Sequence, residues 1–127
     1  KAAPRVAAYD GEISAQIMDV HEMDFDDGAF DQIYTSCTFC SVPNPVDGLR
    51  SLRRVLDPDG ELFMFEHTGS RIFPISVMMN LMTVVSRKLG PDMNRMTQDN
   101  VRAAGFRITE INHIFLDVVK TIRAVPE

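Results

Sequence analysis

Three groups of polar residues follow apolar runs at points where β-strands are expected to end. They are Asp19, the run 35–37 (Thr-Ser-Cys), and the neighbours Glu66 and His67. A carboxylate accepts hydrogen bonds from amino groups, and an imidazole can take up a proton near neutral pH. Ligands of open α/β sheets bind beyond the carboxyl ends of the strands. These residues are therefore the candidates for one binding or catalytic site.

Each candidate also has a purely structural interpretation. Asp19 could cap a turn, one or more of residues 35–37 could bind their own loop, and Glu66 could be a hydrogen-bond acceptor that only supports the fold. The sequence alone leaves these alternatives open. His21 and His113 have no pairing signal nearby, so neither is expected to take part in a site.

Cys37 and Cys40 form a C-x-x-C pattern directly after a predicted strand. This spacing occurs in thiol–disulfide redox sites, where one thiolate is activated, and it could also be half of a zinc site. The next helix is expected to start only at residue 44, and a second pair of metal ligands is missing. We therefore favour two small apolar residues near a strand end, with no metal site, and keep a thiol redox protein as an alternative function.

Apolar periodicity predicts strands and helices in alternation around these candidates. A helix is expected to begin at Asn44 and Pro45 and to end at a turn, residues 57–60. A Met-rich helix is expected over 73–88, and a short helix capped by Thr97 is expected to close at Gly105. The expected strands cover residues 13–20, 30–37, 62–65, 106–111 and 117–125. The last two strands have a connection too short for a crossover helix, so the prediction is an open α/β sheet with an antiparallel C-terminal strand pair.

Composition limits the classes of protein to consider. At 127 residues the chain is one small domain or part of a larger one. The net charge is −5 and no basic patch is visible, so no nucleic-acid partner is expected. The first residues lack an apolar signal segment, and two cysteines are too few for a disulfide scaffold. These features predict a cytoplasmic protein.

The stretch 73–85 is apolar nearly all round and rich in Met, a residue that suits adaptable binding surfaces. It is too short and too polar to span a bilayer. We expect a core helix packed on the sheet. The alternatives are a lid over an apolar substrate, a helix that makes peripheral contact with a membrane, or the surface of a non-catalytic interaction module. The nearby Arg71, Arg87 and Lys88 would suit an anionic membrane surface.

Two longer motifs give the chain a resemblance to a known family. Asp19 and Val20, followed by residues 25–31 (Phe-Asp-Asp-Gly-Ala-Phe-Asp), are similar to the stretch between the third and fourth strands of class I S-adenosylmethionine-dependent methyltransferases. Residues 52–62 (Leu-Arg-Arg-Val-Leu-Asp-Pro-Asp-Gly-Glu-Leu) resemble that family's helix–turn–strand, with Asp59 in place of the first Gly of the turn.

Shorter motifs narrow the resemblance to the type-11 branch, which includes ubiquinone/menaquinone-type, phospholipid and small-thiol methyltransferases. These motifs are residues 39–43 (Phe-Cys-Ser-Val-Pro), Glu66-His67, 93–97 (Met-Asn-Arg-Met-Thr) and 102–106 (Arg-Ala-Ala-Gly-Phe). The similarity extends from about residue 12 to the end of the chain.

The resemblance implies a Rossmann-like methyltransferase sheet and S-adenosylmethionine as the cofactor. Asp19 would accept a hydrogen bond from the adenine amino group, and Val20 would pack beside the ring. Thr35, Ser36 and Cys37 would lie near the methionine part of the cofactor and the transferred methyl group.

The resemblance further implies an acceptor that is a small, apolar molecule of the quinone, lipid or thiol class. Attack would be in line with the bond from sulfur to the methyl group, so catalysis would come largely from positioning. Glu66 or His67 would orient or deprotonate the acceptor.

The family's Gly-rich loop, which lets the backbone approach the cofactor, has no counterpart here, because the seven glycines are scattered. Residues 1–127 are therefore expected to be a single partial domain, the C-terminal part, with the N-terminal strands missing. In the family's sheet two strands lie between those at 13–20 and 30–37. On its own the chain is expected to bind the cofactor weakly or not at all and to be inactive, and exposed sheet edges would favour a homo-oligomer.

Overall fold

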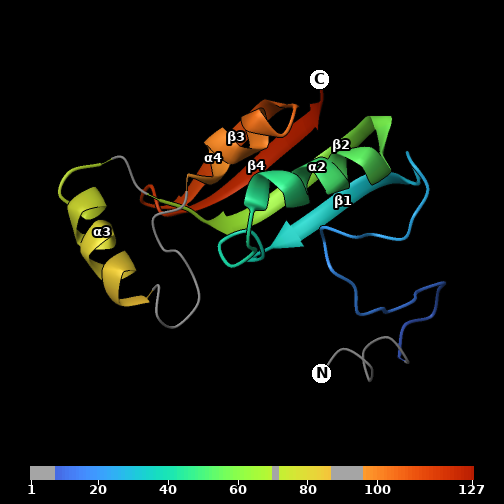
Figure 1. Cartoon of the computed structure of the whole chain (residues 1–127), viewed down its shortest axis with the longest axis horizontal. Coiled ribbons are helices and arrows are strands. Elements are labelled where there is room, and N and C mark those ends of the chain that lie inside the picture. The colour runs from blue at the N-terminus through green and yellow to red at the C-terminus, as the bar shows by residue number, and fades with distance from the viewer. Residues whose placement is uncertain (1–7, 70–71, 87–95) are drawn as a thin grey trace.

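The chain folds into one mixed β-sheet with helices packed against one of its faces. The computed structural model describes residues 8–69, 72–86 and 96–127. The strands are β1 (Phe30–Ser36), β2 (Leu56–His67), β3 (Phe106–Phe115) and β4 (Val119–Pro126), and the helices are α2 (Pro45–Val55), α3 (Ile75–Ser86) and α4 (Thr97–Ala103). Figure 1 shows α2 and α4 against the sheet and α3 apart from it.

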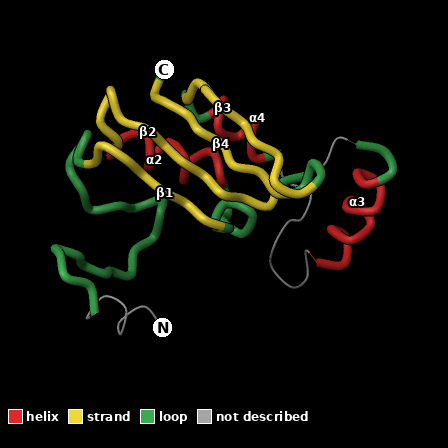
Figure 2. The backbone as a smooth tube through the Cα atoms, turned by 180° about the vertical axis from the view of Figure 1, so that it is seen from behind, coloured by secondary structure: helices red, strands yellow, loops and turns green. Residues whose placement is uncertain are grey.

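The order of strands across the sheet is β1-β2-β4-β3. β1 and β2 are parallel, and α2 supplies the crossover that a parallel pair needs. The β2–β4 and β3–β4 pairs are antiparallel. The predicted α/β sheet with an antiparallel C-terminal strand pair is confirmed. Figure 2 shows the path of its backbone. Because His67 pairs with Val119, the carboxyl end of β2 lies beside the β3–β4 hairpin turn.

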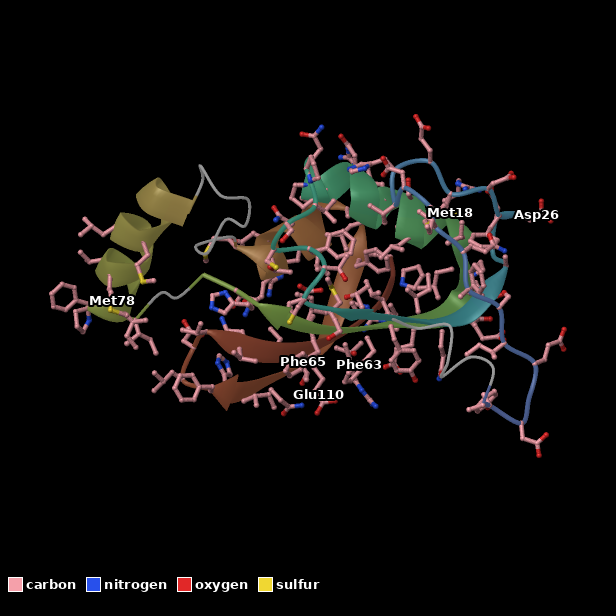
Figure 3. The ribbon with its side chains drawn as sticks, turned by 90° about the horizontal axis from the view of Figure 1, so that it is seen from below. Met18, Asp26, Phe63, Phe65, Met78 and Glu110 are labelled. Carbon is pink, nitrogen blue, oxygen red and sulfur yellow. The ribbon has the colours of Figure 1, made fainter. Side chains whose placement is uncertain are left out.

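The core lies between the sheet and the layer of α2 and α4. Positions 62, 64 and 66 of β2 are buried and alternate with half-exposed positions, since successive side chains of a strand point to opposite faces. Phe63 and Phe65 point to the other face, away from the two helices (Figure 3). The core cluster includes Phe39, Leu49, Leu52, Leu62, Met64, Val101, Phe106 and Ile122.

The prediction of a strand over residues 13–20 is wrong. Residues 12–19 have no regular secondary structure and are exposed, and Ile17 is fully accessible at 106%. A strand is ordered by hydrogen bonds to a neighbouring strand. In the part of the chain that the structure describes, no strand pairs with the outer edge of β1. The alternation of residues 13–20 is thus typical of a strand, but the partner that would order it is not among these residues.

The turn predicted at 57–60 lies within the bounds of β2, which begins immediately after α2. The register between β1 and β2 shifts there, so the turn is accommodated as a bulge. Asp59 N donates to Asp57 Oδ1 at 2.8 Å, which is the local bond of an Asx turn. Gly60 is needed because a Cβ at this position would lie 2.8 Å from the Asp31 carbonyl oxygen.

The helices begin and end in part at the residues predicted to cap them. Asn44 is the N-cap of α2 and Pro45 follows it, as predicted, although the Asn44 side chain makes no capping hydrogen bond. For α4 the prediction is wrong, because Met96 is the N-cap and Thr97 is the first helical residue. The Thr97 side chain is buried, so its hydroxyl faces the core instead of the free amides of the first turn. Gly105 closes α4 with a φ of 87°, the left-handed conformation expected of it.

α3 is confirmed as a helix, but the expectation that it packs on the sheet is wrong. Figures 1 and 2 show it standing off the sheet, whose helical face is already covered by α2 and α4. Phe73 is 80% exposed and Leu81 is 73% exposed. Arg71, Arg87 and Lys88 lie outside the described residues. Among the helices described, none has the length and apolar character needed to cross a bilayer.

Candidate functional site

Glu66 is a buried carboxylate near the end of β2, and it holds the loop that follows β1. Its Oε1 accepts hydrogen bonds from Thr35 Oγ1 at 3.0 Å and from Thr38 N at 3.2 Å, and its Oε2 accepts one from Phe39 N at 3.2 Å. The residue is fully buried. Burial of a carboxylate is tolerated when its oxygens are hydrogen-bonded in this way. The geometry thus gives Glu66 a positioning role, while a direct part in catalysis stays a prediction.

His67 follows Glu66 directly, so the two side chains point to opposite faces of the sheet. Glu66 is buried on the helical face, and His67 is half-exposed on the other. The structure therefore brings the two catalytic candidates to one strand end without bringing them together. Glu66 accepts a hydrogen bond from Thr35, a member of the run 35–37.

The three candidates at the end of β1 are in different surroundings. Thr35 donates its hydroxyl hydrogen to Glu66, whereas Ser36 and Cys37 are exposed. Cys37 N donates to Phe65 O at 2.8 Å, which continues the β1–β2 pairing by one residue. Cys37 then adopts a left-handed φ of 49°, and the chain turns away from the sheet. Ser36 and Cys37 are thus the accessible members of the run.

Asp19 and His21 form a pair, whereas no pairing partner was expected for His21 from the sequence. Asp19 Oδ1 accepts a hydrogen bond from His21 N at 2.9 Å and lies 2.8 Å from His21 Nδ1. His21 Nε2 lies 2.7 Å from the Pro43 carbonyl oxygen. Since a carboxylate and a carbonyl both accept, a ring protonated on both nitrogens satisfies both contacts. The Asp-x-His spacing was the available signal, because an Asx turn bonds residue i to the amide of i+2.

These contacts shift both pKa values in the directions expected of an ion pair. The His21 backbone amide, and then its ring, lower the pKa of Asp19. The hydrogen bond to Asp19 raises the pKa of His21, and the carbonyl oxygens of Pro43 and Asn44 add to the effect. The pair therefore ties the segment around Asp19 to the residues just before α2.

An open pocket of about 610 Å³ joins Asp19 to the loop after β1, and this size is ordinary for a small-molecule site. Thr38 belongs both to this pocket and to the loop held by Glu66. Val20 packs close to α2 at Gly48, where a Cβ would lie 3.2 Å from the Val20 side chain. The lining residues are Met18, Asp19, Val20, His21, Thr38, Val42, Pro43 and Asn44. Asp19 and Val20 thus lie beside the carboxyl end of β1, but in a loop and not at the end of a strand.

Lys120 and Asp117 form a buried ion pair in the same region as Glu66, with 2.6 Å between Nζ and Oδ1. Lys120 pairs with Glu66 in the β2–β4 register, so both side chains point to the helical face. His113 Nδ1 lies 3.3 Å from the same Asp117 oxygen, a contact that the sequence did not indicate. The signal in the sequence was a lysine inside an apolar strand, because a buried lysine needs a partner.

A second pocket, of about 590 Å³, lies at the opposite end of the parallel strands, and Arg54, one of the three arginines that line it, is already engaged. Arg54 Nη1 donates to Phe25 O at 2.7 Å and to Asp27 Oδ1 at 2.8 Å, and its Nη2 donates to Met23 O at 2.6 Å. These bonds fasten the acidic segment to α2. This pocket is thus a structural junction, and the pocket at Asp19 is the better candidate site.

The described residues contain no group of three or more His, Cys, Asp and Glu side chains placed to hold a metal ion. Cys37 and Cys40 are free thiols.

Comparison with known proteins identifies the family of the chain. Residues 1–64, just over half of the chain, match the family profile described as "Methyltransferase domain". No curated protein matches the chain in sequence.

Solved structures share the fold. The PH0226 protein from Pyrococcus horikoshii OT3 has a TM-score of 0.75 at 11% identity, over 99% of this chain and 65% of that one. The trans-methyltransferase CalH, in complex with SAH, has a TM-score of 0.70 at 20% identity, over 99% of this chain and 39% of that one. The cyclase SpnF has a TM-score of 0.59 at 22% identity, over 76% of this chain and 33% of that one. At these identities the likeness concerns the fold alone, and this chain spans less than two-thirds of each of these proteins.

Proposed function

Because this chain belongs to the methyltransferase domain family, we propose that it is the C-terminal part of an S-adenosylmethionine-dependent methyltransferase domain. The observation that carries the proposal is the pocket that joins Asp19 and Val20 to the loop after β1. Asp19 is 66% exposed, so an amino group can approach its carboxylate from solvent. Val20 and Val42 supply apolar wall for a planar ring. A carboxylate acceptor beside an apolar wall is what an adenine base requires.

The methyl group would then be transferred near the exposed Ser36 and Cys37. The reaction needs an acceptor atom in line with the sulfur–methyl bond, so correct placement supplies most of the catalysis. Glu66 contributes by fixing the two amides that follow Cys37. His67, half-exposed at the same strand end, is the group suited to take a proton from the acceptor.

The proposed acceptor is small and apolar, of the quinone, lipid or thiol class. Support comes from exposed apolar side chains at the end of the sheet where β1 and β2 finish. Phe73 and Leu81 are exposed around α3, and Phe115 and Leu116 are exposed at the β3–β4 turn. Exposed apolar surface of this kind is typical of proteins that meet a lipid or an apolar ligand. Peripheral contact of a cytoplasmic protein with a membrane is part of the proposal, and failure to float with anionic liposomes would count against that part.

Self-association is the proposed consequence of the edge at β1. Its outer edge carries backbone groups with no strand partner among the described residues, and such edges pair with other strands. A purely non-catalytic interaction module is the alternative function. Sedimentation velocity distinguishes a monomer from a homo-oligomer, and cofactor binding distinguishes the module from the methyltransferase.

Cofactor binding by the isolated chain is expected to be weak, because the sequence lacks a Gly-rich loop. The test is a titration with S-adenosylmethionine followed by the NMR signals of the cofactor. Asp19→Asn should weaken binding about 2- to 12-fold, because it replaces a charged acceptor by a neutral one, a loss of about 0.5–1.5 kcal/mol. Asp26→Asn is the matched control, because Asp26 is exposed on the same segment and points into solvent (Figure 3). Equal effects of the two variants would contradict the proposed role of Asp19, and tight binding by calorimetry would contradict only the expectation that the isolated chain binds weakly.

A further inference from the structure

Cys37 and Cys40 lie on either side of the two amides that bind Glu66, in the loop after β1. Thr38 N and Phe39 N are those amides. Ser41 N then donates to Thr38 O at 3.0 Å, so the chain closes a tight turn within these few residues. The loop is thus fixed at the sheet by Glu66, with one thiol at each end of the fixed part.

The side chain of Cys40 lies against the backbone of Cys37. Cys40 Sγ lies 3.5 Å from the carbonyl oxygen of Cys37, so the second thiol already touches the backbone of the first. The turn closed by the bond from Ser41 N to Thr38 O begins one residue after Cys37 and includes Cys40, and a disulfide requires a Cα separation of about 4.4–6.8 Å. A disulfide here requires that the two sulfurs meet through side-chain rotation and adjustment of these few residues.

We propose that Cys37 and Cys40 form a reversible intramolecular disulfide, which makes this loop a redox-sensitive modification site. The accessibilities assign the roles, because Cys37 is exposed and Cys40 is half-buried. An accessible thiol next to a resolving thiol is the arrangement found in redox-sensing pairs. The proposal depends only on the thiols and their loop, and it stands whether or not the chain transfers methyl groups.

The oxidant is a small disulfide such as oxidised glutathione. The Cys37 thiolate attacks one sulfur of the oxidant, which forms a mixed disulfide and releases one glutathione thiolate. The Cys40 thiolate then attacks Cys37 Sγ, forms the internal disulfide and releases the second glutathione. The two cysteines together lose two protons and two electrons, and one glutathione disulfide is reduced to two thiols. A dithiol reductant reverses both steps.

The internal disulfide would close a ring around Thr38 and Phe39, the residues whose amides position Glu66. Oxidation therefore restricts the loop at the pocket that Thr38 helps to line. It also removes the exposed Cys37 thiol from the end of β1.

The experiment treats the whole chain with oxidised glutathione, then with a maleimide, and measures the intact mass before and after a dithiol reductant. The unaltered chain should lose the mass of two hydrogens, take up no maleimide, and recover both reactive thiols on reduction. The Cys40→Ser variant should stop at a stable glutathione adduct on Cys37. The proposal is overturned if the unaltered chain also stops at a glutathione adduct, forms only disulfides between chains, or keeps both thiols reactive. The unaltered chain decides the question even if the variant fails to fold.

Discussion

Replacement of Glu66 by glutamine tests whether this carboxylate holds the loop after β1. Glutamine keeps the shape of the side chain but has one acceptor oxygen where glutamate has two. The carboxylate accepts from Thr35 Oγ1 and Thr38 N with Oε1, and from Phe39 N with Oε2. In the best arrangement open to the Glu66→Gln variant, the amide oxygen takes the Oε1 position, and the NH₂ group then faces the Phe39 N–H. One charge-assisted hydrogen bond is lost, and one buried amide has no acceptor.

The magnitude follows from these three bonds. A hydrogen bond to a charged group contributes about 1.5–3 kcal/mol, and a buried amide left without an acceptor costs about 1–3 kcal/mol. The smaller desolvation cost of a neutral amide offsets part of this loss. We therefore expect Glu66→Gln to lower the free energy of unfolding by about 2 kcal/mol. The exchange of the Phe39 amide hydrogen should become faster by a factor of about 30 if the loss is local.

The assay is urea unfolding followed by far-ultraviolet circular dichroism, since the chain contains no Trp. Glu61→Gln is the matched control, because it makes the same chemical change in the same strand. Glu61 lies 4.0 Å from Arg123 in a partly exposed pair, so its loss should stay below about 0.5 kcal/mol. Equal stability losses for the two variants, or an unchanged Phe39 exchange rate in Glu66→Gln, would refute the reasoning.

Three further predictions concern the surroundings of the site. Gly60→Ala should lower the free energy of unfolding by about 1–3 kcal/mol, because its Cβ would lie 2.8 and 2.9 Å from two backbone carbonyl oxygens; an unchanged thermal midpoint would show that the bulge is looser than described. Arg54→Lys should cost about 1 kcal/mol and speed proteolysis within residues 23–27, since lysine cannot bond three oxygens with one planar group. Arg50→Lys, in an exposed ion pair, is the control and should change stability by less than about 0.5 kcal/mol. Equal stability changes in the two variants would contradict the role of Arg54 in fastening residues 23–27. His21 should titrate above its ordinary pKa of about 6.5 in an NMR titration, and Asp19→Asn should return it towards that value.

The sign of the pH effect follows from the two shifts. The raised pKa of His21 gives stability that is complete below about pH 6.5 and is lost as pH rises through the folded-state pKa. The lowered pKa of Asp19 gives stability that is present above about pH 3.9 and is lost as pH falls through its folded-state pKa. The contact between them should therefore be strongest between these limits, and a chemical shift of His21 that is insensitive to Asp19→Asn would contradict it.

The elements that local sequence determines were predictable. The strand that became β1 is rich in residues that favour strands, and Pro45 fixed the start of α2. The short connection between the last two strands required an antiparallel pair, and β3 and β4 form one. These features depend on residues that are near one another in the chain.

Features that depend on distant partners were not predictable in the same way. Residues 13–20 have the alternation of a strand, yet an ordered strand needs a neighbour beside it. α3 is a helix by its own composition, but its position depends on which sheet face is free. The buried pair of Lys120 and Asp117 is visible only once β4 is placed beside β2.

The candidate site was predictable as a region and not as a set of contacts. Alternation along β2 requires Glu66 and His67 to diverge, but only the fold shows which of them is buried. No local pattern indicates that Glu66 binds Thr38 and Phe39, because these residues are 28 and 27 positions away.

The most direct test of the central claim is a map of backbone amide shifts of the isotope-labelled chain during a titration with S-adenosylmethionine. We predict that the amides of Val20, Thr38 and Phe39 shift together, as part of one site at the carboxyl end of β1. The amides of Gly28 and Arg53, at the opposite pocket, should stay in place. Shifts confined to Gly28 and Arg53, or no shift at any of these amides at millimolar cofactor, would contradict the claim.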